Sequence, residues 1–114
     1  MVTIVAALHV YFLVLEMFLW RTRVGLRTFR MTAELADSSA VLAANQGLYN
    51  GFLAAGLFWA LLAYGVVVGK PIITFFLLCV IAAGVYGAAT VGRRILFVQA
   101  VPAAVALVLV WLSH

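Results

Sequence analysis

Five side chains that could do acid–base or hydrogen-bond chemistry lie inside stretches that are otherwise apolar. His9 and Glu16 belong to the first apolar stretch of the sequence, and Asn45, Gln46 and Asn50 belong to the second. A carboxyl group in apolar surroundings can bind a cation, transfer a proton, or act as a general acid or base. Amides can support that chemistry, or they can simply hydrogen-bond neighbouring helices. Which of these applies depends on the elements that carry the five residues.

The composition excludes an ordinary soluble domain. Of 114 residues, 68% are hydrophobic and only 9% are charged, and the mean hydropathy is +1.26. A soluble domain of this size needs a charged shell, which this chain cannot provide. The net charge of +4 comes from residues beside apolar runs, as in membrane proteins, so we expect a lipid bilayer as partner and no nucleic acid. The single cysteine, Cys79, excludes an intramolecular disulfide and a cysteine metal cluster.

Four apolar runs predict an all-α fold, a transmembrane four-helix antiparallel bundle that forms one integral-membrane domain over residues 1–114. Each run is long enough to cross about 30 Å of hydrocarbon as a helix, the structure that satisfies its own backbone hydrogen bonds. Asp37, Ser38 or Ser39 is the predicted N-cap of the second helix. The predicted spans are approximately residues 2–20, 41–64, 71–90 and 95–112.

The connections between these runs predict the orientation in the membrane. The first and third connections together hold six basic residues, whereas the second holds only Lys70. Basic residues concentrate in cytoplasmic loops. We therefore expect a multi-pass protein of the bacterial cytoplasmic membrane with both termini outside. The six residues are Arg21, Arg23, Arg27, Arg30, Arg93 and Arg94.

Depth along the predicted helices places the polar residues in two layers. Glu16 lies roughly 6 Å from the cytoplasmic end of its run at 1.5 Å per residue, and the pair Asn45 and Gln46 lies at a similar depth. His9 and Asn50 match each other nearer the middle. His9 and Glu16 are seven residues apart and share a helix face, as do Gln46 and Asn50 at a separation of four. The ligand-binding candidates are His9, Glu16, Asn45, Gln46, Asn50, Tyr86 and Gln99.

Small residues recur at four-residue spacing on two of the predicted helices. Such stripes let helix backbones approach closely in a membrane. One stripe could serve packing within the bundle and the other a homodimer, and the sequence does not distinguish them. The helix-packing candidates are Gly47, Gly51, Ala55, Gly84 and Ala88.

Two sequence motifs resemble those of a known family. EMFLW at 16–20 and AANQGLYNGFLAAGL at 43–57 are similar to motifs of the domain-of-unknown-function 1304 family, which comprises small bacterial integral-membrane proteins. The resemblance spans almost the whole chain and implies a four-span protein of this size. It implies no established activity and transfers no catalytic role.

The leading hypothesis for function is binding or transport of a small molecule or ion through a polar chamber lined by His9, Glu16, Gln46 and Asn50. One alternative is an intramembrane enzyme acting on a lipid-like substrate, with Glu16 as acid or base, His9 as its partner and the amides as electrophilic stabilisers. Another is an accessory subunit whose amides only pack helices. No metal site or cofactor is predicted, because His114 is the only other histidine and no ligand spacing is present. Catalytic residues and the identity of the ligand stay open.

Overall fold

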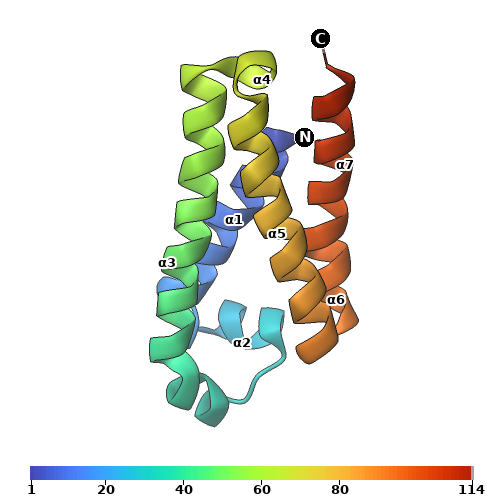
Figure 1. Cartoon of the computed structure of the whole chain (residues 1–114). Helices are drawn as coiled ribbons and strands as arrows, with labels where there is room; N and C mark the ends of the chain where they lie inside the picture. Colours follow the sequence, from blue (N-terminus) through green and yellow to red (C-terminus); the bar gives the residue numbers. More distant parts are fainter. Residues whose placement is uncertain (114) are drawn as a thin grey trace. The chain divides into compact units, whose positions relative to one another are not determined.

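The computed structural model describes residues 1–113 and is helical across them, with no strand in that range (Figure 1). The prediction of an all-α fold is therefore confirmed for the described residues. The chain divides into two compact units, of which the first contains Met1–Ala6 and the residues from Leu53 onward, and the second is Ala7–Phe52. The elements are α1 (Val2–Met17), α2 (Arg23–Phe29), α3 (Ala33–Ala63), α4 (Gly65–Val68), α5 (Lys70–Thr90), α6 (Arg93–Ile95), the π-helical η1 (Leu96–Ala100) and α7 (Val101–Leu112).

Two helical stretches are long and apolar enough to cross a membrane. They are Lys70–Thr90, with a mean hydropathy of 2.3, and Arg93–Leu112, which joins α6, η1 and α7, with 2.5. Only 22% of each is buried, whereas the core helix of a soluble protein is mostly buried. The apolar helix α1 is shorter at 16 residues. Helix α3 has 31 residues, but three amides interrupt its apolar sequence, so the four-span bundle stays a prediction.

Several helix boundaries differ from the predicted spans. Helix α1 ends at Met17 rather than at residue 20, and α3 begins at Ala33 rather than at residue 41. The predicted N-cap at Asp37, Ser38 or Ser39 is therefore wrong, because all three residues lie inside α3. The hydroxyl of Thr32 accepts a hydrogen bond from the backbone N–H of Leu35 at 3.1 Å, which places the cap five residues before Asp37.

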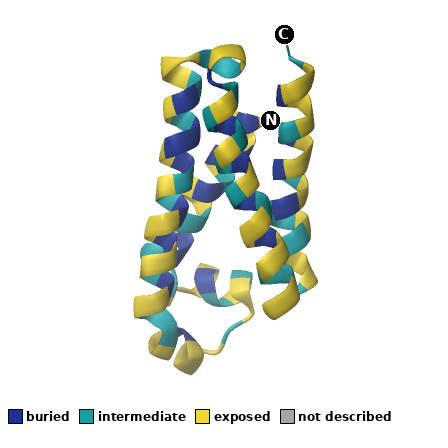
Figure 2. Ribbon diagram, viewed as in Figure 1, coloured by how far each residue is buried: buried dark blue, intermediate teal, exposed yellow. Residues whose placement is uncertain are grey.

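The first unit is built around an apolar core to which the start of α1, the end of α3, α5 and α7 all contribute. Core positions recur every three or four residues on each helix, as expected for helices that pack along one face. Figure 2 shows the buried residues of α7 on the side toward α5 and exposed residues on its outer side. The buried members are Val2, Val5, Ala6, Leu57, Ala60, Ile73, Leu77, Val80, Ala103, Ala106 and Val110.

Polar contacts tie the beginning of α5 to the end of α7 in the same unit. Lys70 Nζ donates a hydrogen bond to the backbone oxygen of Ser113 at 3.0 Å and lies 5.1 Å from the ring centre of Trp111. Trp111 Nε1 donates to Thr74 Oγ1 at 3.1 Å. Helix α5 and the stretch 93–112 are therefore antiparallel, so Lys70 lies at the opposite end of this helix pair from Arg93.

In the second unit, the short helix α2 connects α1 to α3. Trp20 anchors this connection, because its Nε1 donates to Ser39 Oγ at 3.1 Å and its ring packs against Phe29 at 4.7 Å. Gly25 lies directly against the backbone of Leu19 and Trp20, where a larger residue would not fit. The end of α1 and the beginning of α3 are thereby held at fixed positions within this unit.

Candidate functional site

The second unit buries one carboxyl group against one amide. Asn50 Nδ2, on α3, donates a hydrogen bond to Glu16 Oε1, on α1, at 2.5 Å. The two residues are only 5% and 8% exposed. Because a buried polar side chain is costly unless it is hydrogen-bonded, this contact explains why an asparagine is tolerated in the apolar part of α3.

Two glycines of α3 allow α1 to approach closely enough for this contact. A Cβ atom at Gly47 would lie 2.7 Å from Met17 Cγ and 3.1 Å from Glu16 Cβ. A Cβ atom at Gly51 would lie 2.5 Å from Leu13 Cδ1. Gly47 and Gly51 therefore serve packing inside the second unit. Packing within the chain was one of the two uses predicted for the small-residue stripes.

No lysine or arginine side chain pairs with Glu16 within the described residues. The ion pair found there is Arg21 with Asp37, whose N and O atoms are 3.6 Å apart and whose side chains are both exposed. Removing one partner of a buried ion pair leaves an uncompensated charge, which is strongly unfavourable. An ionised Glu16 would be in that situation, because its hydrogen-bond partner is an amide and no lysine or arginine among the described residues pairs with it.

His9 is the other buried ionisable side chain of this unit. It is 1% exposed, and its ring contacts Phe12 edge-on at a centroid distance of 5.5 Å. It lies seven residues before Glu16 on α1 and so shares its face. Among residues 1–113, no group of three or more histidine, cysteine or acidic side chains could hold a metal ion.

The remaining candidates are two further amides of the second unit and two residues of the first unit. Asn45 and Gln46 are exposed, so neither is buried together with Asn50, although Gln46 lies only one turn before it. Tyr86 and Gln99 belong to the first unit, where Tyr86 is 71% exposed. The structure therefore brings together Glu16 and Asn50 and places Gln46 outside the predicted chamber.

The second stripe of small residues also packs within its own unit. A Cβ atom at Gly84 would lie 2.7 Å from the backbone nitrogen of Ala100 on η1. Ala88, one turn after Gly84 in the same stripe, is half-buried. Ala55, the last residue of the other stripe, lies on α3 and is exposed. Gly84 is thus a point of close approach between α5 and η1 in the first unit.

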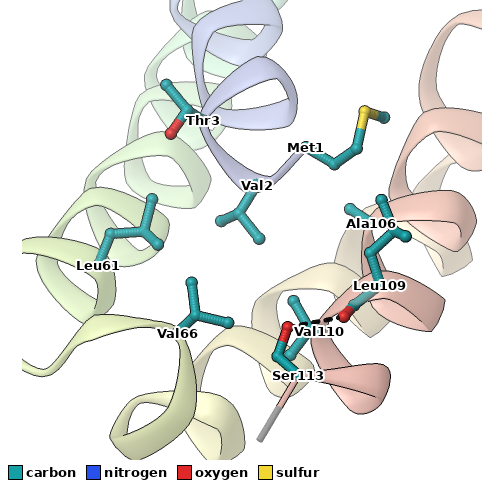
Figure 3. A pocket seen from close by; sticks show the side chains of 9 residues that line it. All are labelled: Met1, Val2, Thr3, Leu61, Val66, Ala106, Leu109, Val110 and Ser113. Atoms are coloured by element: carbon teal, nitrogen blue, oxygen red, sulfur yellow. Dashed lines mark hydrogen bonds between the residues drawn. The ribbon is translucent and has the colours of Figure 1, made fainter.

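An apolar pocket in the first unit lay outside the sequence predictions. It involves none of the candidate residues, and its only hydroxyl groups come from Thr3 and Ser113 (Figure 3). Ser113 Oγ donates to the backbone oxygen of Leu109 at 2.9 Å. No motif marked this pocket, because its residues come from four separate elements. They are Met1, Val2, Thr3, Leu61, Val66, Ala106, Leu109, Val110 and Ser113.

Comparison with known proteins identifies the family. The model of a family described as protein of unknown function, DUF1304, matches residues 3–111. The chain belongs to the DUF1304 family. The resemblance predicted from the two motifs is thereby confirmed, and the match includes both Glu16 and Asn50.

A curated relative of this DUF1304 chain matches it over most of the length of both proteins. An uncharacterized protein, YpaA, of Lactococcus lactis subsp. lactis (strain IL1403) is 31% identical over 107 residues, covering 92% of this chain and 88% of the relative. No solved structure matches the chain. Family membership therefore brings no activity with it, and function has to be argued from the Glu16 site.

Proposed function

We propose that this chain is a four-span membrane protein that binds a proton or a monovalent cation at Glu16 and exchanges one for the other. The observation that carries the proposal is a buried carboxyl group with an amide partner and no lysine or arginine partner within the described residues. An exchange site of this kind would serve the transport of the cation across the membrane.

The exposed surface supports the membrane part of the proposal. Large apolar side chains are exposed on every long helix, among them Val41 at 84%, Leu62 at 85% and Val108 at 59%. Soluble monomers rarely expose extensive apolar surface. A bilayer accommodates all of it, including the outer faces of α5 and α7 seen in Figure 2.

The chemistry of the site supports the cation part. A carboxylate in hydrocarbon is costly unless something neutralises it. Since no lysine or arginine does so within the described residues, the neutralising group comes from solution, as a proton or as a cation that replaces it. Asn50 holds one carboxyl oxygen and leaves the other available to either of them.

Carbodiimide labelling tests this proposal, because carbodiimides react with protonated carboxyl groups. The protein in its membrane would be treated with dicyclohexylcarbodiimide and the modified residue located by mass spectrometry. We expect labelling at Glu16 rather than at the exposed Glu34 or Asp37, and slower labelling when Na⁺ or tetraphenylphosphonium is added. Glu16→Gln should remove the labelled peptide, and Glu34→Gln should leave it unchanged.

A second function is favoured by the closed packing around Glu16. The hydrogen bond from Asn50 to Glu16 and the contacts at Gly47 are also what would be expected if this site only packs α1 against α3. In that case the chain is an accessory subunit whose polar pair fixes α1 against α3. Labelling that neither cation slows, or no labelling at Glu16, would favour this role over exchange.

A further inference from the structure

The outer face of α3 in the second unit carries two amides among apolar side chains. Asn45 and Gln46 are exposed there, with Leu42 on one side and Tyr49 and Phe52 on the other, which are 74%, 59% and 54% exposed. The separations of three, one, three and three residues place all five on one side of the helix. We refer to these five residues as the outer face of α3.

The two amides have no hydrogen-bond partner within the described part of the chain. Lipid tails offer none, so amides at such positions hydrogen-bond a neighbouring helix when one is available. Asn50, four residues beyond Gln46 on the same helix, faces inward and is buried in a hydrogen bond with Glu16 of α1. Within the second unit, no other helix takes the role of α1 for Asn45 and Gln46, which are exposed.

We propose that a second copy of this chain packs on the outer face of α3, with Asn45 and Gln46 hydrogen-bonded to their counterparts across a two-fold axis. The face carries no ionised group, so it calls for no oppositely charged partner. An amide is both a donor and an acceptor, so the same surface on two copies is complementary to itself. A single asparagine in an apolar helix seam is a known way to specify a dimer.

The glycines of the two small-residue stripes pack against helices of their own chain. Gly47 and Gly51 lie against α1, and Gly84 lies against η1. The outer face of α3 instead presents aromatic side chains, with Tyr49 and Phe52 in edge-to-face contact at 5.7 Å. Such a pair supplies contact area beside the amides.

Cysteine cross-linking in native membranes tests this interface. In a Cys79→Ala background, Tyr49→Cys should form a disulfide-linked dimer on mild oxidation. Val10→Cys, an exposed position on α1 of the same unit, should stay monomeric. Combining Tyr49→Cys with Asn45→Leu and Gln46→Leu should raise the dissociation constant of the dimer roughly tenfold, since two interhelical amide bonds are lost.

Other outcomes would overturn the proposal. A monomer at Tyr49→Cys would mean that the amides face lipid headgroups, and an unchanged dimer after both leucine substitutions would mean that the amides do not hold it. Circular dichroism should show unaltered helix content in the leucine variant, because both positions are exposed. The inference rests on the membrane placement but not on cation binding. Glu16→Gln should therefore dimerise like the parent protein even where carbodiimide labelling fails.

Discussion

Asn50 donates a buried hydrogen bond to Glu16, joining two residues that lie 34 positions apart. The contact links α1 to α3 inside the second unit and accounts for the one amide of the second apolar run that faces inward. It also leaves a carboxyl group with no lysine or arginine partner among the described residues. The proposed exchange of a proton for a cation follows from that imbalance.

A double-mutant cycle should show that Glu16 and Asn50 are coupled. Asn50→Leu is expected to lower the free energy of unfolding by about 1–3 kcal/mol, because the buried carboxyl loses its donor. Once Glu16→Leu is present, the same change should cost less, with a coupling energy of about 0.5–3 kcal/mol. Unfolding in detergent would be followed by circular dichroism.

Gln46 provides the control for this cycle. The sequence predicted that it couples to Glu16, but it lies on the outer face of α3. Gln46→Leu and Glu16→Leu are therefore expected to have additive effects. Coupling as strong as that of Asn50 would contradict the orientation of α3 described above.

Gly84→Ala should destabilise the first unit. The added Cβ atom would lie 2.7 Å from the backbone nitrogen of Ala100, and backbone cannot move aside as a flexible side chain can. The expected cost is about 1–3 kcal/mol, as for other overpacked positions. Thermal unfolding of the purified protein would measure it.

Gly92→Ala is the matched control for that substitution. Nothing lies within 4 Å of the Cβ position at Gly92, and its backbone is extended, with φ at 169°. An alanine there should leave the melting temperature nearly unchanged. Equal loss at both positions would show that Gly84 is not a point of close approach.

The proposed topology predicts which side of the membrane each connection faces. In a Cys79→Ala background, a membrane-impermeant maleimide added from outside should label Val68→Cys, in the exposed α4 turn, and should not label Arg27→Cys. Disrupted membranes should allow labelling of both. The reverse pattern in intact cells would place the arginine-rich connection outside and remove the basis for the orientation.

The helical fold could be predicted from sequence because long apolar runs have few alternatives in a membrane. The start of α3 could not, since Asp37, Ser38 and Ser39 all suit an N-cap and only the hydrogen bond from Leu35 to Thr32 shows which turn begins the helix. That Glu16 faces the second run was also predictable, but matching depth set it level with Asn45 and Gln46 and set Asn50 level with His9, whereas the structure joins Glu16 to Asn50.

Which amide meets Glu16 was beyond the sequence. Asn45, Gln46 and Asn50 lie within two turns, and a rotation of α3 by a fraction of a turn exchanges their faces. The position of Gly47 decides the rotation, because a residue without a side chain is needed where Met17 and Glu16 approach. The sequence also could not show which contacts the two stripes of small residues make, since the same spacing suits packing within a chain and between chains.

Proton release on cation binding tests the central role of Glu16 most directly. Purified protein in weakly buffered detergent would be mixed with tetraphenylphosphonium or NaCl while a pH indicator records released protons. The proposal predicts release of about one proton per chain, since the carboxyl group loses its proton to solution when a cation takes the proton's place. Glu16→Gln should release none. No release with either cation from the parent protein, or equal release from Glu16→Gln, would contradict exchange at Glu16.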